Sequence, residues 1–143
     1  MHATKNSKLF TSKDILDIDR ALANAHVNVG HFDTALEVLK NSAGQFAGLH
    51  GSDSIEYEQS LRDLAMAYIQ MERWPDALDA YQLVRSINAG KSWSNIIEYD
   101  FGISICLQNM GCHRDNVAVF QRIIDCCERE GQVNDKRYRR ALY

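Results

Sequence analysis

The sequence predicts an all-α fold built from repeated helix hairpins, and three observations point to it. The chain has one proline, Pro75, and eight glycines in 143 residues, whereas sandwiches and barrels use both residue types in their many turns. Hydrophobic residues make up 45% of the chain and recur at steps of three and four, which places them on one side of a helix. A similar turn sequence also recurs three times, beginning at Gly30, Glu72 and Gly111.

Each of these turns separates two apolar segments of helical period, so the repeated unit is a helix, a tight turn and a second helix. Six helices are expected, at Ser12–Val29, Phe32–Ala47, Ser54–Met71, Trp74–Asn88, Ser92–Met110 and Arg114–Glu130. Ser12 begins the first, and Asp14 lies in its first turn, where the helix dipole favours an acid. Pro75 opens the fourth, where its missing N–H costs nothing.

The apolar stripe of each helix predicts the core. For the first hairpin it contains Ile15, Ile18, Leu22, Ala25 and Val29, followed by Ala35, Leu36, Leu39 and Ala43. For the second it contains Leu61, Leu64, Ala65, Tyr68, Ile69, Ala77, Leu78, Tyr81 and Val84. For the third it contains Phe101, Ile103, Cys106, Leu107, Met110, Val117, Phe120, Ile123, Ile124 and Cys127.

The second unit reads Leu64-Ala65-x-x-Tyr68 and then Ala77-x-x-x-Tyr81, which resembles the signature of the tetratricopeptide repeat (TPR). The first unit has Leu22-Ala23 and Ala35, and the third has Ile103-Ser104 and Asn116, with the same 13-residue separation. Asn116 takes the place of the signature alanine, so the third repeat is expected to be the most irregular. Small residues at Ala23, Ala65 and Ser104 fit positions where two helices approach closely.

The repeat is longer than usual. Equivalent positions in successive units, Ala35, Ala77 and Asn116, are about 40 residues apart, whereas the ordinary TPR unit has about 34 residues. This resembles the long-repeat branch of the family, as in kinesin light chains and the helical regions of bacterial signalling regulators. The resemblance implies a right-handed α-solenoid in one domain, residues 12–143, with repeats at about 12–51, 52–90 and 91–131. A flexible tail is expected at 1–11 and a short capping helix at 134–143.

The residue pattern argues against an enzyme, a metal site and a cofactor. The four cysteines, Cys106, Cys112, Cys126 and Cys127, include no C-x-x-C pair, and adjacent cysteines point about 100° apart on a helix. Cys106 and Cys127 are expected in the core and Cys112 as an exposed thiol. No phosphate-binding, dinucleotide-binding or zinc-protease motif is present. A thiol or metal enzyme centred on Cys112 and His113 stays open as a rival hypothesis.

The charge and hydropathy of the chain limit the classes of partner that it can bind. With 19 acidic and 16 basic residues the net charge is −3, which does not favour nucleic acid. No apolar run approaches the length of a membrane-spanning helix and no secretory signal opens the sequence, so a cytoplasmic protein outside the membrane is expected. The basic run at 135–143 is interpreted as a solvated capping helix, with contact to an acidic partner or nucleic acid as the alternative.

The resemblance also implies a concave groove, lined by the first helix of each hairpin, that binds a peptide. The expected groove residues are Arg20, Asn24, Arg62, Met66, Gln70, Phe101, Ile105 and Gln108. Arg20 and Asn24 match the first pair of the family's clamp for chaperone C-termini, but Met66, Phe101 and Ile105 stand where the clamp has Asn and basic residues. The sequence therefore predicts no chaperone clamp. It leaves open whether a following helix covers Phe101 and Ile105.

The function expected from these observations is a non-enzymatic protein–protein interaction module, an adaptor, scaffold or chaperone-like protein that binds a peptide or helix in its groove. One alternative is a ligand- or peptide-sensing regulatory domain of a larger bacterial signalling regulator. Another is a self-associating scaffold that forms a homodimer through an open repeat end.

Overall fold

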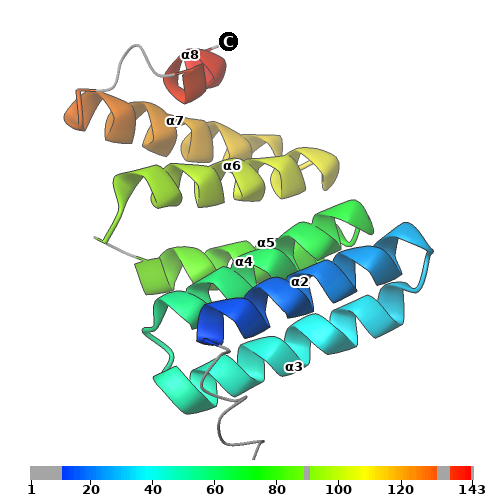
Figure 1. Ribbon diagram of the computed structural model, residues 1–143. Helices are drawn as coiled ribbons and strands as arrows, with labels where there is room; N and C mark the ends of the chain where they lie inside the picture. The colour runs from blue at the N-terminus through cyan, green and yellow to red at the C-terminus, as the bar shows by residue number, and fades with distance from the viewer. Residues whose placement is uncertain (1–10, 89–90, 132–135, 143) are drawn as a thin grey trace, which may run out of the picture. The chain divides into compact units, whose positions relative to one another are not determined.

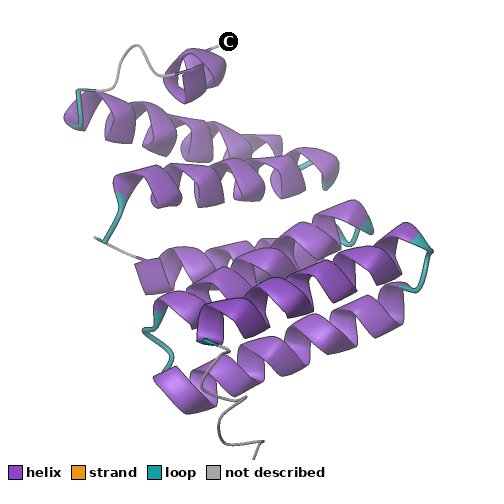
Figure 2. Ribbon diagram, in the orientation of Figure 1, coloured by secondary structure: helices purple, strands orange, loops and turns teal. Residues whose placement is uncertain are grey.

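The computed structural model describes residues 11–88, 91–131 and 136–142, and these residues form helices and turns without a strand (Figures 1 and 2). The helices are α2 (Ser12–Asn28), α3 (Phe32–His50), α4 (Ile55–Gln70), α5 (Trp74–Asn88), α6 (Trp93–Asn109), α7 (His113–Arg129) and α8 (Lys136–Leu142). The all-α prediction is confirmed, and the six hairpin helices begin and end close to the expected residues. The tail expected at 1–11 lies outside the described residues except for Thr11.

Contacts group the chain into two compact units, residues 1–67 and 68–143, with the boundary inside α4. In the first unit α2 and α3 pack as an antiparallel hairpin (Figure 1). A 2.7 Å hydrogen bond between Ser12 Oγ and His50 Nε2 joins the start of α2 to the end of α3. Arg20 Nε donates to Asp63 Oδ2 at 2.9 Å and so joins α2 to α4.

The core face expected for the first helix is wrong. The helix buries Leu16 and Ala23, while its predicted core residues are exposed: Ile15, Ile18, Leu22, Ala25 and Val29. Apolar residues occur on both sides of α2, and helical period alone cannot say which side meets the rest of the fold. Two further expected core residues are also exposed: Met110, which is the C-cap of α6, and Val117, which lies within α7 but not on the side that buries Asn116 and Val119.

Helix α2 begins at Ser12, as expected, and the residue before it caps the helix. Thr11, not Ser12, is the N-cap, and Asp14 N donates to Thr11 Oγ1 at 3.2 Å. In return Thr11 N donates to Asp14 Oδ2 at 2.8 Å, which completes a capping box. These hydrogen bonds, the one from the Thr11 backbone first, hold the pKa of Asp14 below its ordinary value.

The three recurring turn sequences form the same structure. Gly30, Glu72 and Gly111 each follow a helix with a positive φ, of 83°, 58° and 76°. The next backbone N–H then reaches back over the helix end in each case, as in His31 N to His26 O at 2.8 Å. This is the Schellman arrangement, which favours glycine at the residue with positive φ. Glu72 is the exception among the three.

In the second unit α6 and α7 form an antiparallel hairpin, α5 contacts α6, and α8 contacts α7 (Figure 1). Gly102 of α6 packs directly on the ring of Tyr81 in α5. The apolar core between these helices includes Ile97, Ile103, Cys106, Val119, Ile123 and Cys127, each at most 3% exposed. Burial of each Ile or Val side chain in this core contributes roughly 1.5–3 kcal/mol to the free energy of folding. This burial holds the α6–α7 hairpin against α5.

Candidate functional site

Three of the eight predicted groove residues come together in one hollow of the second unit. Phe101, Ile105 and Gln108 lie at steps of four and three on α6, and so share one face of that helix. They line a hollow of about 1090 Å³ that α7 and α8 complete. We call this hollow the α6–α8 groove. Its lining residues are Phe101, Ser104, Ile105, Gln108, His113, Asn116, Phe120, Lys136, Arg139, Arg140, Ala141 and Leu142.

The floor of the α6–α8 groove is partly apolar. The rings of Phe101 and Phe120 meet edge to face with their centroids 6.4 Å apart, which ties α6 to α7 beneath the groove. Ile105 is 38% exposed beside them. A partner side chain entering the groove can therefore bury hydrocarbon against surface that is now in contact with water.

The rim of the groove that α8 supplies is basic. Lys136, Arg139 and Arg140 line it, and no Asp or Glu is among the described lining residues. The Arg140 guanidinium lies over the Phe101 ring, 5.3 Å from its centroid, in a cation–π contact. Arg140 thus covers part of Phe101, while Ile105 stays accessible. The groove combines apolar surface with an excess of positive charge.

Comparison with known proteins gives the family. The family model for the tetratricopeptide repeat matches residues 14–88, which is more than half of the chain. The chain belongs to the TPR family. The resemblance that the sequence predicts is therefore confirmed.

Solved structures show the same TPR fold. One is a protein of Podosopora anserina named as a kinesin light chain with nearly identical TPR-like repeats, with a TM-score of 0.70 at 17% identity. A variant of that protein has a TM-score of 0.72 at 16% identity. Each match covers 88% of this chain but only 61% of the solved chain. No curated protein is significantly similar to the sequence. TPR proteins generally mediate protein–protein interactions, and the repeat is typically not catalytic.

Four of the remaining five predicted groove residues lie in the first unit, and none of the four is buried: Arg20, Asn24, Arg62 and Met66. Arg20 is already engaged by Asp63, whose carboxylate is 2.9 Å from its guanidinium. Burial raises the pKa of Asp63, and the hydrogen bond and charge of Arg20 oppose that rise. Gln70 lies in the second unit, is exposed, and does not line the α6–α8 groove.

Cys106 and Cys127 lie in the core, as the sequence predicts, whereas the sequence gives no prediction for Cys126. Cys106, Cys126 and Cys127 are buried, and Cys112 is partly exposed. Burial raises the pKa of the Cys106 thiol to about 11, so it stays protonated at neutral pH. Among the described residues no three His, Cys, Asp or Glu side chains gather closely enough to hold a metal ion. No described helix is long and apolar enough to cross a membrane.

The sequence leaves open whether a following helix covers Phe101 and Ile105, and in the structure Arg140 of α8 lies over Phe101 while Ile105 is 38% exposed. Sequence reasoning did not predict which basic residues of α8 line the groove. The basic run is visible in the sequence, but helical spacing does not say which helix a later segment will contact. Arg140 and Phe101 are too far apart along the chain for any local pattern to pair them. The signal that could have found the groove is the coincidence of a basic run with exposed apolar residues on the preceding first helix.

Proposed function

We propose that this TPR protein is a non-enzymatic interaction module whose α6–α8 groove binds an acidic, amphipathic segment of a partner protein. The observation that supports this function is the composition of the groove. Apolar side chains of α6 and α7 form its floor, three basic side chains of α8 line its rim, and no acidic residue among the described lining residues offsets them.

The physical basis of binding divides between these two parts. An apolar partner side chain that covers Ile105 and Phe101 supplies affinity, at about 25 cal/mol for each Å² of apolar surface removed from water. Carboxylates that meet Arg139 and Arg140 supply orientation and a faster encounter, since rim charges act mainly on the association rate. Helices already fixed by their packing lose little entropy on binding.

Selection of random peptides displayed on phage against the intact chain tests this proposal. We expect the enriched peptides to combine Leu, Ile or Phe with Asp or Glu, and to lose binding to an Ile105→Glu variant. The matched control is Val117→Glu, which makes the same kind of change at a residue that is 69% exposed and lines neither the groove nor its rim. Enrichment of basic peptides, or equal binding to Ile105→Glu, contradicts the proposal.

A second candidate function, self-association, is favoured by the exposed apolar face of α2. Ile15, Ile18, Leu22 and Val29 are 42%, 53%, 46% and 66% exposed. With Ala25 they follow steps of three and four, which is the spacing of the a and d positions in a two-helix coiled coil. A second copy could cover this face by packing its own α2 against it.

Light scattering over a concentration series tests self-association. If the α2 face is the interface, the mass doubles as concentration rises and Ile18→Asp keeps the chain monomeric, because a charge would be buried in the seam. Val117→Asp serves as the control and should dimerise like the wild type. A constant monomer mass for the wild type, or a dimer that survives Ile18→Asp, excludes this face.

A further inference from the structure

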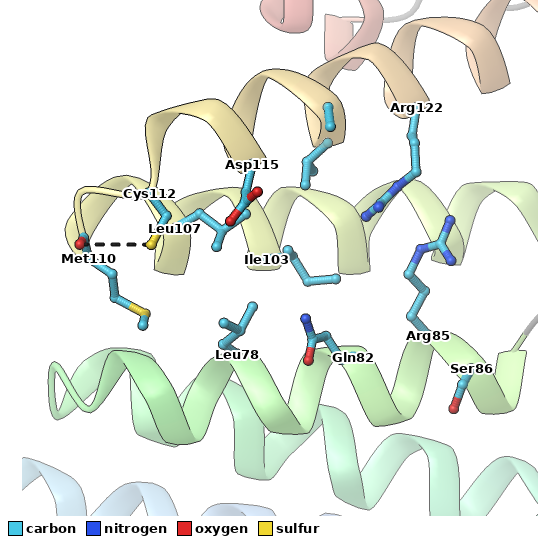
Figure 3. A pocket seen from close by; sticks show the side chains of 12 residues that line it. Leu78, Gln82, Arg85, Ser86, Ile103, Leu107, Met110, Cys112, Asp115 and Arg122 are labelled. Atoms are coloured by element: carbon cyan, nitrogen blue, oxygen red, sulfur yellow. Dashed lines mark hydrogen bonds between the residues drawn. The ribbon is translucent and has the colours of Figure 1, made fainter.

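A second hollow of about 560 Å³ lies in the same unit between α5, α6 and α7 (Figure 3). It shares no lining residue with the α6–α8 groove. Its apolar part comes from Ile103 and Leu107 of α6, Val119 of α7 and Leu78 of α5. The volume falls within the range of small-molecule sites, roughly 300–1,000 Å³. We call it the α5–α7 pocket.

Two arginines at one end of the α5–α7 pocket share a single buried carboxylate. Arg85 Nε and Arg122 Nη2 donate to the same oxygen, Asp100 Oδ1, at 2.7 and 2.8 Å. Asp100 is 1% exposed, whereas the arginine side chains are 33% and 45% exposed and both line the pocket. A guanidinium keeps its charge and has five N–H donors, so one carboxylate leaves this end with a positive charge in excess and with donors to spare.

The only acidic side chain among the described lining residues is at the other end of the pocket. Asp115 lies beside Leu107 and Cys112, away from Arg85 and Arg122 (Figure 3). A bound anion would be repelled from Asp115 and attracted to the arginine pair. The pocket therefore has room for one negative charge, at a defined end, with hydrocarbon between the two ends.

We infer that the α5–α7 pocket binds a small monocarboxylate with a hydrocarbon body. The carboxylate would accept charge-assisted hydrogen bonds from Arg85 and Arg122, and the body would cover Ile103, Leu107 and Val119. Charge-assisted hydrogen bonds and the burial of hydrocarbon then both contribute to the affinity for the same ligand. This inference stands on residues that the α6–α8 groove does not use, and so is independent of the function proposed above.

Calorimetric titration of the full chain with decanoate, decanol and acetate tests the chemistry of the site. We expect saturable binding of one decanoate, binding of decanol at least tenfold weaker because it lacks the carboxylate, and no measurable binding of acetate. Equal affinity for decanol and decanoate would show that the arginines do not recognise the ligand, and overturns the inference. Absence of decanoate binding overturns it as well.

Two variants locate the binding. Arg122→Gln should weaken decanoate binding about tenfold or more, whereas Arg129→Gln, on the same helix and 71% exposed, should leave it unchanged. Because Arg122 also holds Asp100, a second variant leaves the charged groups alone: Ala118→Leu places a larger side chain in the lining and should reduce binding by obstructing the hydrocarbon body. Wild-type affinity in both Arg122→Gln and Ala118→Leu overturns the assignment.

Two further measurements separate the pocket from the groove and identify the source of the carboxylate. Ile105→Glu should bind decanoate like the wild type, so that failure of the α6–α8 groove and failure of the α5–α7 pocket are distinguishable. Decanoate is then displaced with a short peptide ending in leucine, as the free acid and as the amide. Displacement by the acid alone supports a peptide C-terminus as the natural form of this ligand, and no displacement supports a small organic acid.

Discussion

Ser104 Oγ donates a 2.6 Å hydrogen bond to Asn116 Oδ1, and both residues are buried between α6 and α7. They occupy the positions at which the TPR signature has glycine and alanine. The two departures of the third repeat therefore satisfy each other. This pair lies within the α6–α7 contact, and the family-model match to residues 14–88 ends before this hairpin.

A double-mutant cycle tests this coupling. Ser104→Ala leaves a buried amide oxygen without its donor and should lower the free energy of unfolding by about 1–3 kcal/mol. Asn116→Ala should also destabilise, but the double variant should cost at least about 1 kcal/mol less than the sum of the single changes. Urea unfolding measures all four proteins. Additive losses would mean that the two side chains do not depend on each other.

The ring of Tyr81 leaves no space for a side chain at Gly102. A Cβ built on Gly102 would lie 2.5–2.6 Å from three atoms of that ring, closer than packed atoms can approach. We expect Gly102→Ala to destabilise by about 1–3 kcal/mol through overpacking, despite the better helix propensity of alanine. Gly44→Ala in α3 is the control, because a Cβ there meets nothing within 4 Å and should stabilise by about 0.5–1 kcal/mol. Thermal unfolding of both variants measures these changes in stability. Stabilisation by Gly102→Ala would contradict the close contact between Gly102 and Tyr81.

Glu72 adopts the backbone conformation for which the other two turns use glycine. Its φ of 58° crowds the Cβ against the following carbonyl, at a cost of about 1–2 kcal/mol for an L-residue. Glu72→Gly should therefore raise the midpoint of urea unfolding, while Gly30→Ala at the equivalent first turn should lower it. If Glu72→Gly destabilises the protein, the side chain makes a contact worth more than the strain.

Asp63 makes stability depend on pH. Burial raises its pKa above the ordinary value of 3.8, and Arg20 opposes but does not cancel that shift. Because the folded state then holds the proton more tightly than the unfolded state, the contribution to stability is full below 3.8 and is lost as pH rises through the folded-state pKa. Relative to Asp63→Asn, the wild type should lose free energy of unfolding as pH rises through this range. Urea titrations at several acidic pH values measure this difference in the free energy of unfolding. If the wild type instead gains stability relative to Asp63→Asn as pH rises, the pKa of Asp63 is lowered in the folded state and the prediction is wrong.

Local pattern was enough to predict the hairpins. The turns beginning at Gly30, Glu72 and Gly111 have similar sequences because each ends a helix with a residue of positive φ. A few adjacent residues are enough to determine such a turn. The 13-residue spacing between signature positions fixes the register of each hairpin for the same reason. Helix limits depend on caps and spacing, so they could be predicted closely.

The exposed face of α2 and the two hollows could not be predicted in this way. Leu22 and Leu16 are equally apolar and differ only in which side of α2 meets other helices. The arginines around Asp100 come from 15 residues before it and 22 after it. Contacts at such separations follow from how hairpins pack, which a periodic pattern on one helix does not specify.

The affinity of a phage-selected acidic peptide for the α6–α8 groove tests the proposed function most directly. Fluorescence anisotropy would compare the wild type, Ile105→Glu, Arg140→Glu and the control Val117→Glu, each first shown to unfold at the wild-type temperature. We predict that Val117→Glu binds like the wild type, and that Ile105→Glu binds at least tenfold more weakly. Arg140→Glu should weaken binding most at low salt, because its contribution is electrostatic. Equal affinities for all four proteins would contradict the account.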